Sequence, residues 1–130
     1  MTTKKTYKSV SEKAASILSN SSMQIVCKLG DIMAERGLNQ TEVAFLTGLR
    51  QATINSIIHN KNATINKEHS MVLMKTLKLT SLTELYDIVI EEDELKELEE
   101  EKAIVEANGL TPEQEQQLGT YKRNLKADTE

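Results

Sequence analysis

The amino-acid sequence predicts an all-α fold, a helical domain followed by a C-terminal helical hairpin. Apolar residues recur at helical spacing in several segments, and one proline and five glycines among 130 residues leave room for long helices. No segment alternates convincingly between apolar and polar residues, so strands are not expected. Because aromatic residues make up only 3%, we expect a core of Leu, Ile, Val and Met.

Residues 1–21 are predicted to be a basic N-terminal arm. It contains four lysines, Lys4, Lys5, Lys8 and Lys13, among Ser, Thr and Asn. Three interpretations stay open: a frayed arm, a short amphipathic helix, or an arm that contacts a DNA backbone or minor groove.

Residues 22–90 are predicted to form one helical domain. The first helix is expected over residues 22–36, with Gly37 as its C-terminal stop. A polar linker over residues 60–66 precedes a helix over residues 67–79. A fifth helix is expected to start at Ser81, where Glu84 completes a capping-box pattern.

Residues 40–59 predict two short helices joined by a glycine turn, the arrangement that places a helix in the DNA major groove. The small Ala44 allows a second helix to cross closely, and Gly48 suits a left-handed turn. Asn39 and Glu42 form a capping-box pattern before the first helix. The apolar residues expected to face inward are Val43, Leu49, Ile54 and Ile57.

The opposite face of the second short helix carries small or uncharged polar side chains. They are Gln51, Ala52, Thr53, Asn55 and Ser56. A solvated face more usually carries Lys and Glu, whereas amide and hydroxyl groups can both donate and accept hydrogen bonds at base edges. This composition favours a face that reads DNA.

Residues 91–130 are predicted to be an acidic helical hairpin. A thin apolar stripe runs to the stop at Gly109, and Thr111, Pro112 and Gln114 restart a helix with a capping pattern. The stripe is too narrow to fold alone, so the hairpin is expected to pack on its own domain or on a second subunit. The alternative is a solvated acidic tail.

Net charge is unevenly distributed. Residues 1–22 carry +3, residues 23–90 carry +1 and residues 91–130 carry −8. The predicted DNA-binding part is therefore only mildly basic, and specific contacts and dimerisation would have to supply much of the binding.

Several other functions find little support in the sequence. The single Cys27 rules out an internal disulfide framework and suits a reducing cytoplasm, where we expect the protein to reside. No apolar stretch near the length of a membrane span is present. His59 and His69 lack further ligands at metal-binding spacing, and no catalytic motif or cofactor-binding loop appears, so we expect no enzyme, metal or cofactor.

Residues 29–86 resemble the DNA-binding domain of the phage-repressor (lambda-repressor-like, or Xre) helix-turn-helix family. The matching residues are Leu29, Gly37-Leu38-Asn39-Gln40, Thr41-Glu42-Val43-Ala44, Gly48, Thr53-Ile54, Ile57, Asn60-Lys61, Leu77, Leu79, Ser81, Glu84 and Leu85. The resemblance implies a five-helix domain that binds DNA, usually as a dimer on an inverted repeat. Where some members carry a buried Arg–Glu pair, this chain has Met33 and Ile58, which we expect to pack together.

The resemblance also implies roles for individual residues. Gln40 would contact a phosphate at a helix N-terminus. Gln51, Ala52 and Ser56 would face the bases, with Thr53 and Asn55 beside them. The candidates for backbone contacts are Arg50, Asn60, Lys61 and the amide group at Asn62.

We therefore expect a sequence-specific transcriptional regulator, a repressor that binds a palindromic operator in double-stranded DNA as a homodimer. The alternative is a protein-interaction module, an antitoxin or phage-type inhibitor whose acidic residues 91–130 bind a regulatory partner protein.

Overall fold

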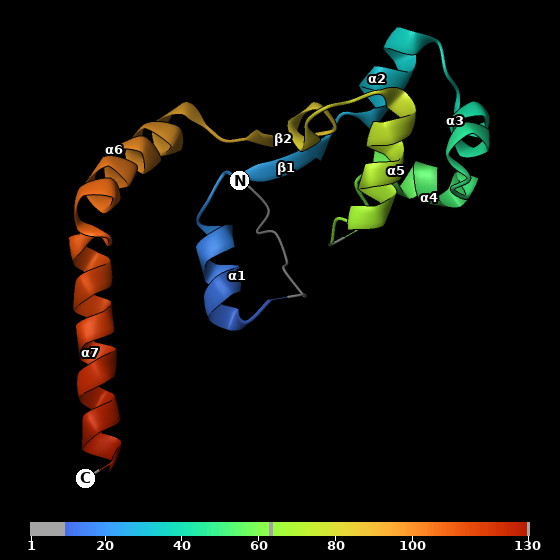
Figure 1. The fold of residues 1–130 in the computed structure, drawn as a ribbon. Helices are drawn as coiled ribbons and strands as arrows, with labels where there is room; N and C mark the ends of the chain where they lie inside the picture. Colours follow the sequence, from blue (N-terminus) through green and yellow to red (C-terminus); the bar gives the residue numbers. More distant parts are fainter. Residues whose placement is uncertain (1–9, 63, 130) are drawn as a thin grey trace. The chain divides into compact units, whose positions relative to one another are not determined.

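The computed structural model describes residues 10–62 and 64–129 (Figure 1). They fall into two compact units, one ending at Ile90 and one beginning at Glu91. Helices dominate both units, which confirms the all-α class, although the first unit also contains a two-stranded sheet.

A short helix, α1 (Glu12–Ser19), is present in the segment expected to be a basic arm. Its N-terminus is capped by Ser11, whose Oγ accepts a hydrogen bond of 3.3 Å from the main-chain nitrogen of Ala14. The amphipathic-helix interpretation is thus correct for this part. Lys4, Lys5 and Lys8 lie outside the described residues.

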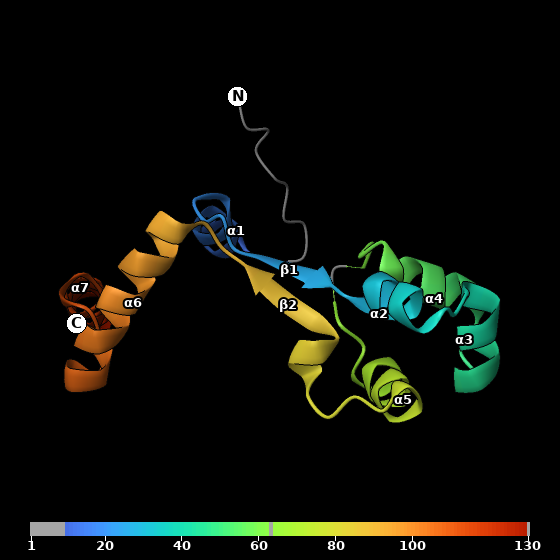
Figure 2. The same cartoon turned by 90° about the horizontal axis from the view of Figure 1, so that it is seen from above.

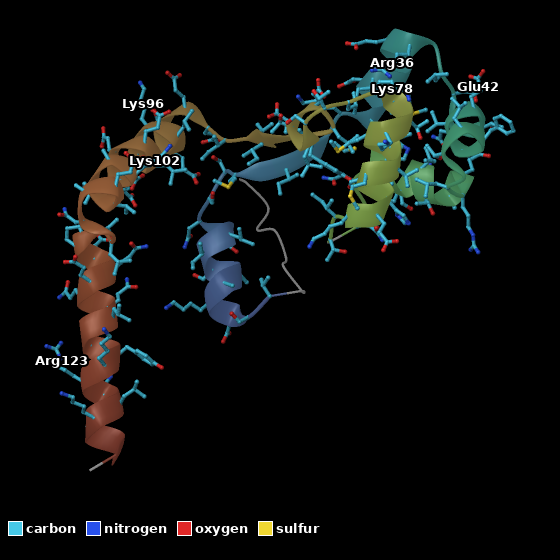
Figure 3. All side chains as sticks on the ribbon, in the orientation of Figure 1. Arg36, Glu42, Lys78, Lys96, Lys102 and Arg123 are labelled. Atoms are coloured by element: carbon cyan, nitrogen blue, oxygen red, sulfur yellow. The ribbon has the colours of Figure 1, made fainter. Side chains whose placement is uncertain are left out.

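Four helices build the centre of the first unit: α2 (Leu29–Arg36), α3 (Gln40–Thr47), α4 (Gln51–Ile58) and α5 (Lys67–Leu77). Gly37 ends α2 with a left-handed φ of 65°, as its sequence position predicts. The Arg36 side chain donates a hydrogen bond to the main-chain oxygen of Leu77 and so ties the end of α2 to the end of α5. Figure 3 shows Arg36 beside Lys78, the C-cap residue of α5.

The expectation that strands are absent is wrong. Strand β1 (Gln24–Cys27) pairs antiparallel with β2 (Tyr86–Val89), and Figure 2 shows the two lying side by side. Residues 22–36 therefore contain a strand followed by a helix rather than one helix. The predicted fifth helix is a single 3-10 turn, η1 (Leu82–Glu84), that leads into β2. The predicted Ser81–Glu84 capping box is present, but it caps that turn.

Pairing between distant segments explains this difference. Ile25 lies opposite Ile88 in the ribbon, and β-branched residues favour strands when a partner is available. Lys28 extends the connection, because its main-chain nitrogen donates to the oxygen of Leu85 at 2.7 Å and its Nζ to the oxygen of Thr83 at 3.0 Å. The apolar spacing around Ile25 fits a helix equally well, so periodicity alone misleads there.

The core consists of aliphatic residues and methionine, as composition predicts. Its members are Leu29, Ile32, Met33, Val43, Ile54, Ile57, Leu73, Leu77 and Leu85. Met33 is buried in this cluster and Ile58 packs against the cluster, so apolar residues occupy both positions of the replaced ion pair. Direct contact between these two side chains stays a prediction.

The second unit contains α6 (Glu92–Asn108) and α7 (Pro112–Thr129). Gly109 ends α6 with φ 89°, and Thr111 and Gln114 form the predicted reciprocal cap, with hydrogen bonds of 3.1 and 3.2 Å. Two C-terminal helices joined by a short turn are present, as predicted, but they do not pack against each other. Over the part of the chain described, the two helices make almost no contact along their lengths, and α7 leads away from α6 (Figure 1). Their narrow apolar stripes stay exposed.

Candidate nucleic-acid interface

The α3–α4 unit is fixed by local hydrogen bonds at its start and at its turn. The Asn39 Oδ1 accepts from the nitrogen of Glu42 at 2.8 Å, and the Glu42 Oε1 accepts from the nitrogen of Asn39 at 2.9 Å. Figure 3 shows Glu42 on α3. This reciprocal pair is the predicted capping box.

The turn between the two helices depends on Gly48. Its φ of 77° is left-handed, a conformation that costs an L-residue energy. The Thr47 hydroxyl donates to the oxygen of Val43 at 2.7 Å and accepts from the nitrogen of Leu49 at 3.2 Å, which bridges the turn. The prediction of a glycine-dependent turn is confirmed.

Helix α4 has one buried face and one accessible face. Ile54 and Ile57 are buried in the core, whereas Gln51 and Ala52 are exposed at the start of the helix. Thr53, Asn55 and Ser56 are half-buried, and no acidic residue lies in the first turn. An anionic ligand near the N-terminus of α4 would therefore meet no carboxylate from that turn and would face the positive end of the helix dipole.

A polar groove lies between α4 and the start of α5. Ala52, Thr53 and Ser56 line one side of it. The other lining residues are Asn62, Thr64, Asn66 and His69. Sequence reasoning missed Thr64, Asn66 and His69 because their proximity to α4 depends on the path of the linker. The polar composition of residues 60–66 is the one sequence feature that could have indicated that this segment lines a polar groove.

Two predicted contact residues from different helices meet inside the unit. The Asn55 Nδ2 lies 3.5 Å from the Oε1 of Gln40, at the long limit for a hydrogen bond. Gln40 begins α3 and Asn55 lies on α4, so this contact brings the start of one helix to the middle of the other. Each amide keeps further hydrogen-bonding capacity.

The residues predicted to contact the DNA backbone surround α4. Arg50 precedes the first turn, and Lys61 and Asn62 follow the last one, all three exposed. Asn60 differs, because its Nδ2 donates to the main-chain oxygen of Ile25 at 2.9 Å. Its side-chain nitrogen is therefore engaged within the protein, a role that the sequence did not predict.

Two other described titratable groups, Cys27 and Tyr86, have pKa values shifted by burial. Burial raises the pKa of the Cys27 thiol, and Tyr86, opposite it in the ribbon, also has a pKa raised by burial. A raised thiol pKa lowers the thiolate fraction at neutral pH, which fits a structural role. Within residues 10–62 and 64–129, no group of His, Cys, Asp and Glu side chains is arranged to hold a metal ion.

A capped first helix, a left-handed glycine turn and a second helix with an accessible polar face define a helix-turn-helix DNA-binding unit. Residues 28–91 match the family model of the Cro/C1-type HTH DNA-binding domain. These residues therefore belong to the phage-repressor-like, or Xre, class of helix-turn-helix domains, and the protein is a DNA-binding transcription regulator. Domains of this family are typically non-enzymatic.

The match covers just under half of the chain, from Lys28 to Glu91, and leaves α1 and most of the second unit outside it. No significant match was found among curated proteins or among solved structures. None of the helices in the described ranges is both long enough and apolar enough to cross a membrane.

Proposed function

We propose that the protein is a transcriptional repressor that binds a two-fold symmetric operator as a dimer, with α4 in the major groove. The observation that supports this most directly is the accessible face of α4, where Gln51 and Ala52 stand exposed beside the half-buried Ser56. These side chains project from a helix that the core holds rigidly through Ile54 and Ile57. Half-sites would lie about one helical turn, roughly 10 bp, apart.

Base reading is assigned to the first two turns of α4. Gln51 can pair bidentately with adenine, and Ala52 can contact a thymine methyl group. Ser56 follows one turn later, with Thr53 and Asn55 beside these residues. The preference of the protein for one DNA sequence would thus depend on a few side chains of α4.

Phosphate contacts are assigned to the surroundings of α4. Gln40 lies at the N-terminus of α3, where the helix dipole attracts anions. Arg50 and Lys61 provide positive charge at the two ends of α4, and the amide group at Asn62 and the remaining capacity of Asn60 provide neutral contacts. With a net charge of only +1 over residues 23–90, we expect a shallow dependence of affinity on salt.

The test begins with selection of binding sites from a random-sequence DNA library by the full-length protein. Gln51→Ala should cost about 1–3 kcal/mol at one base position and relax preference there, whereas Lys61→Ala should weaken binding to all sequences alike. Lys75→Ala removes another exposed lysine, from the last turn of α5 outside the proposed interface, and should leave affinity unchanged. If Gln51→Ala selects the same sequences as the wild type, the base-reading role is wrong.

A second candidate function is binding of a regulatory protein partner by the acidic second unit. The exposed apolar residues of α6 and α7, among them Leu98 and Tyr121, favour it, because such residues often mark interaction surfaces. DNA binding measured with and without residues 91–130 separates the two functions. Loss of DNA binding on truncation indicates that these residues dimerise the repressor, and retained binding leaves them available to a partner.

A further inference from the structure

Both helices of the second unit present an uncovered apolar stripe. On α6, Leu95 and Leu98 are 38% and 45% exposed, and on α7, Leu118, Tyr121 and Leu125 are 40%, 58% and 47% exposed. Leu95 and Leu98 are three residues apart, and the α7 residues follow one another at three and four residues, which is the spacing of a helix–helix seam. Over residues 91–129, neither stripe covers the other.

The helix halves that carry the two stripes differ in charge, and Lys122 is the basic residue of α7 that lies beside its stripe. On α6, Glu99 and Glu101 lie beside the seam positions, and residues 91–101 hold eight acidic side chains against one lysine. On α7, residues 116–127 contain Lys122, Arg123 and Lys126 and no acidic residue. Figure 3 shows Arg123 on the half of α7 toward its C-terminus.

These charges decide which helices can pair. Two copies of α6 side by side would place glutamates next to glutamates, which disfavours pairing. An antiparallel α6–α7 pair would instead place the basic half of α7 along the acidic half of α6, with Leu98 near Tyr121. The sequence of each stripe therefore fits the other helix better than a copy of itself.

The connection between the helices is short and capped on both sides. Gly109 ends α6 with a hydrogen bond from its nitrogen to the oxygen of Val105, and the cap at Thr111 begins α7 immediately afterwards. Within this connection Thr111 is buried, at 8% exposure. The apolar faces of α6 and α7 are complementary but do not contact each other within one chain. Such an arrangement suits a dimer in which each copy packs one of its helices on the other copy.

We propose that α7 of one copy lies antiparallel along α6 of a second copy, and reciprocally, so that the second unit forms a helix-exchanged dimer. This deepens the proposed function and rests on it, because a two-fold symmetric operator requires a dimer. The occupant of each apolar stripe is thus a second copy of this chain, with salt bridges across the rims of the seam.

The charge pattern gives the first test, measured on the full-length protein by sedimentation velocity over a concentration series. Lys122→Glu should raise the dimer dissociation constant several-fold, and Glu99→Lys should do the same. The two changes together should restore the wild-type constant. Strengthened association in the Glu99→Lys variant would overturn the proposal, because it would mean that α6 pairs with α6.

A cross-link distinguishes exchange between copies from closure within one chain. In a Cys27→Ala background, Leu98→Cys/Tyr121→Cys should form disulfides between two chains, visible as a dimer on a non-reducing gel. Bonds within single chains, or a monomeric wild-type protein at every concentration, would overturn the proposal. Circular dichroism on each variant shows whether the helices are retained.

Failure of this inference and failure of the proposed function give different results. If the protein selects a symmetric DNA site but the charge variants keep the wild-type mass, the dimer forms through another surface and only this inference is lost. If the exchanged dimer forms but selection yields no DNA sequence, the repressor function is lost and the interface stands.

Discussion

The side-chain amide of Asn60 donates a hydrogen bond of 2.9 Å to the main-chain oxygen of Ile25, which lies 35 residues earlier in the sequence. Asn60 follows the C-cap of α4 and adopts a left-handed φ of 51°, which Asn tolerates better than most residues. This one side chain therefore connects the end of the proposed DNA-reading helix to strand β1.

Two substitutions at Asn60 separate its side-chain bond from its backbone conformation. Asn60→Ala removes the hydrogen bond and places a less suitable residue at positive φ, so we expect a loss of about 1–2 kcal/mol in the free energy of unfolding. Asn60→Gly also removes the hydrogen bond, but glycine adopts a positive φ without strain. It should therefore lower the free energy of unfolding by less than Asn60→Ala does. Urea denaturation measures both, with exposed Asn62→Ala as the control. Equal losses for the Gly and Ala variants would contradict the backbone part of this prediction.

Gly48 and Gly30 form a second matched pair. A Cβ at Gly48 would meet no atom within 4 Å, so Gly48→Ala is penalised only by the left-handed φ of 77°, by roughly 1–2 kcal/mol. A Cβ at Gly30 would lie 3.5 Å from Cγ2 of Ile58, an ordinary contact in a helix, so Gly30→Ala should be neutral or stabilising by up to about 1 kcal/mol. In thermal unfolding, Gly48→Ala should lower the melting temperature, whereas Gly30→Ala should raise it or leave it unchanged. A stable Gly48→Ala variant would show that the turn can adopt another conformation.

The features that the sequence predicted correctly are local. The Asn39–Glu42 cap and the Gly48 turn each depend on residues within one helical turn, so the nearby sequence contains the information. The buried positions of α4 follow from the spacing of Ile54 and Ile57. The accessible polar face is the remainder of the same helix, which explains why its position could be predicted.

The features that were missed depend on distant residues. The ribbon needs Ile25 opposite Ile88, and no local pattern shows that these segments meet. The groove beside α4 likewise needs His69 to approach Ser56. The open arrangement of α6 and α7 could not be read from composition either, because a closed and an open connection share the same caps at Gly109 and Thr111.

Glu84 predicts a dependence of stability on pH. The main-chain nitrogens of Thr80 and Ser81 donate to its Oε2 at 2.7 and 3.2 Å, and these bonds hold the pKa of the carboxyl below its usual value of 4.5. Because the folded carboxyl holds its proton less tightly than the unfolded one, this contribution is present above pH 4.5 and is lost as the pH falls through the folded pKa. Glu84→Gln should therefore lower the melting temperature at pH 7 and flatten its decrease toward acid pH. An unchanged acid slope, measured by thermal melts at several pH values, would contradict the assignment.

On α3, a small buried side chain contributes more to stability than a large exposed one. Phe45 is the one phenylalanine of the chain and is 86% exposed, whereas Val43, two residues earlier on α3, is fully buried at 0%. Truncation of a buried valine loses transfer energy and leaves a cavity, so Val43→Ala should cost about 2 kcal/mol. Phe45→Ala removes more atoms but should change the free energy of unfolding by less than about 0.5 kcal/mol, since the ring is already in water. Denaturation at low protein concentration measures both in the monomeric state. A loss above about 1 kcal/mol for Phe45→Ala that grows with protein concentration would mean that a second copy covers the ring, because association stabilises the folded form by mass action.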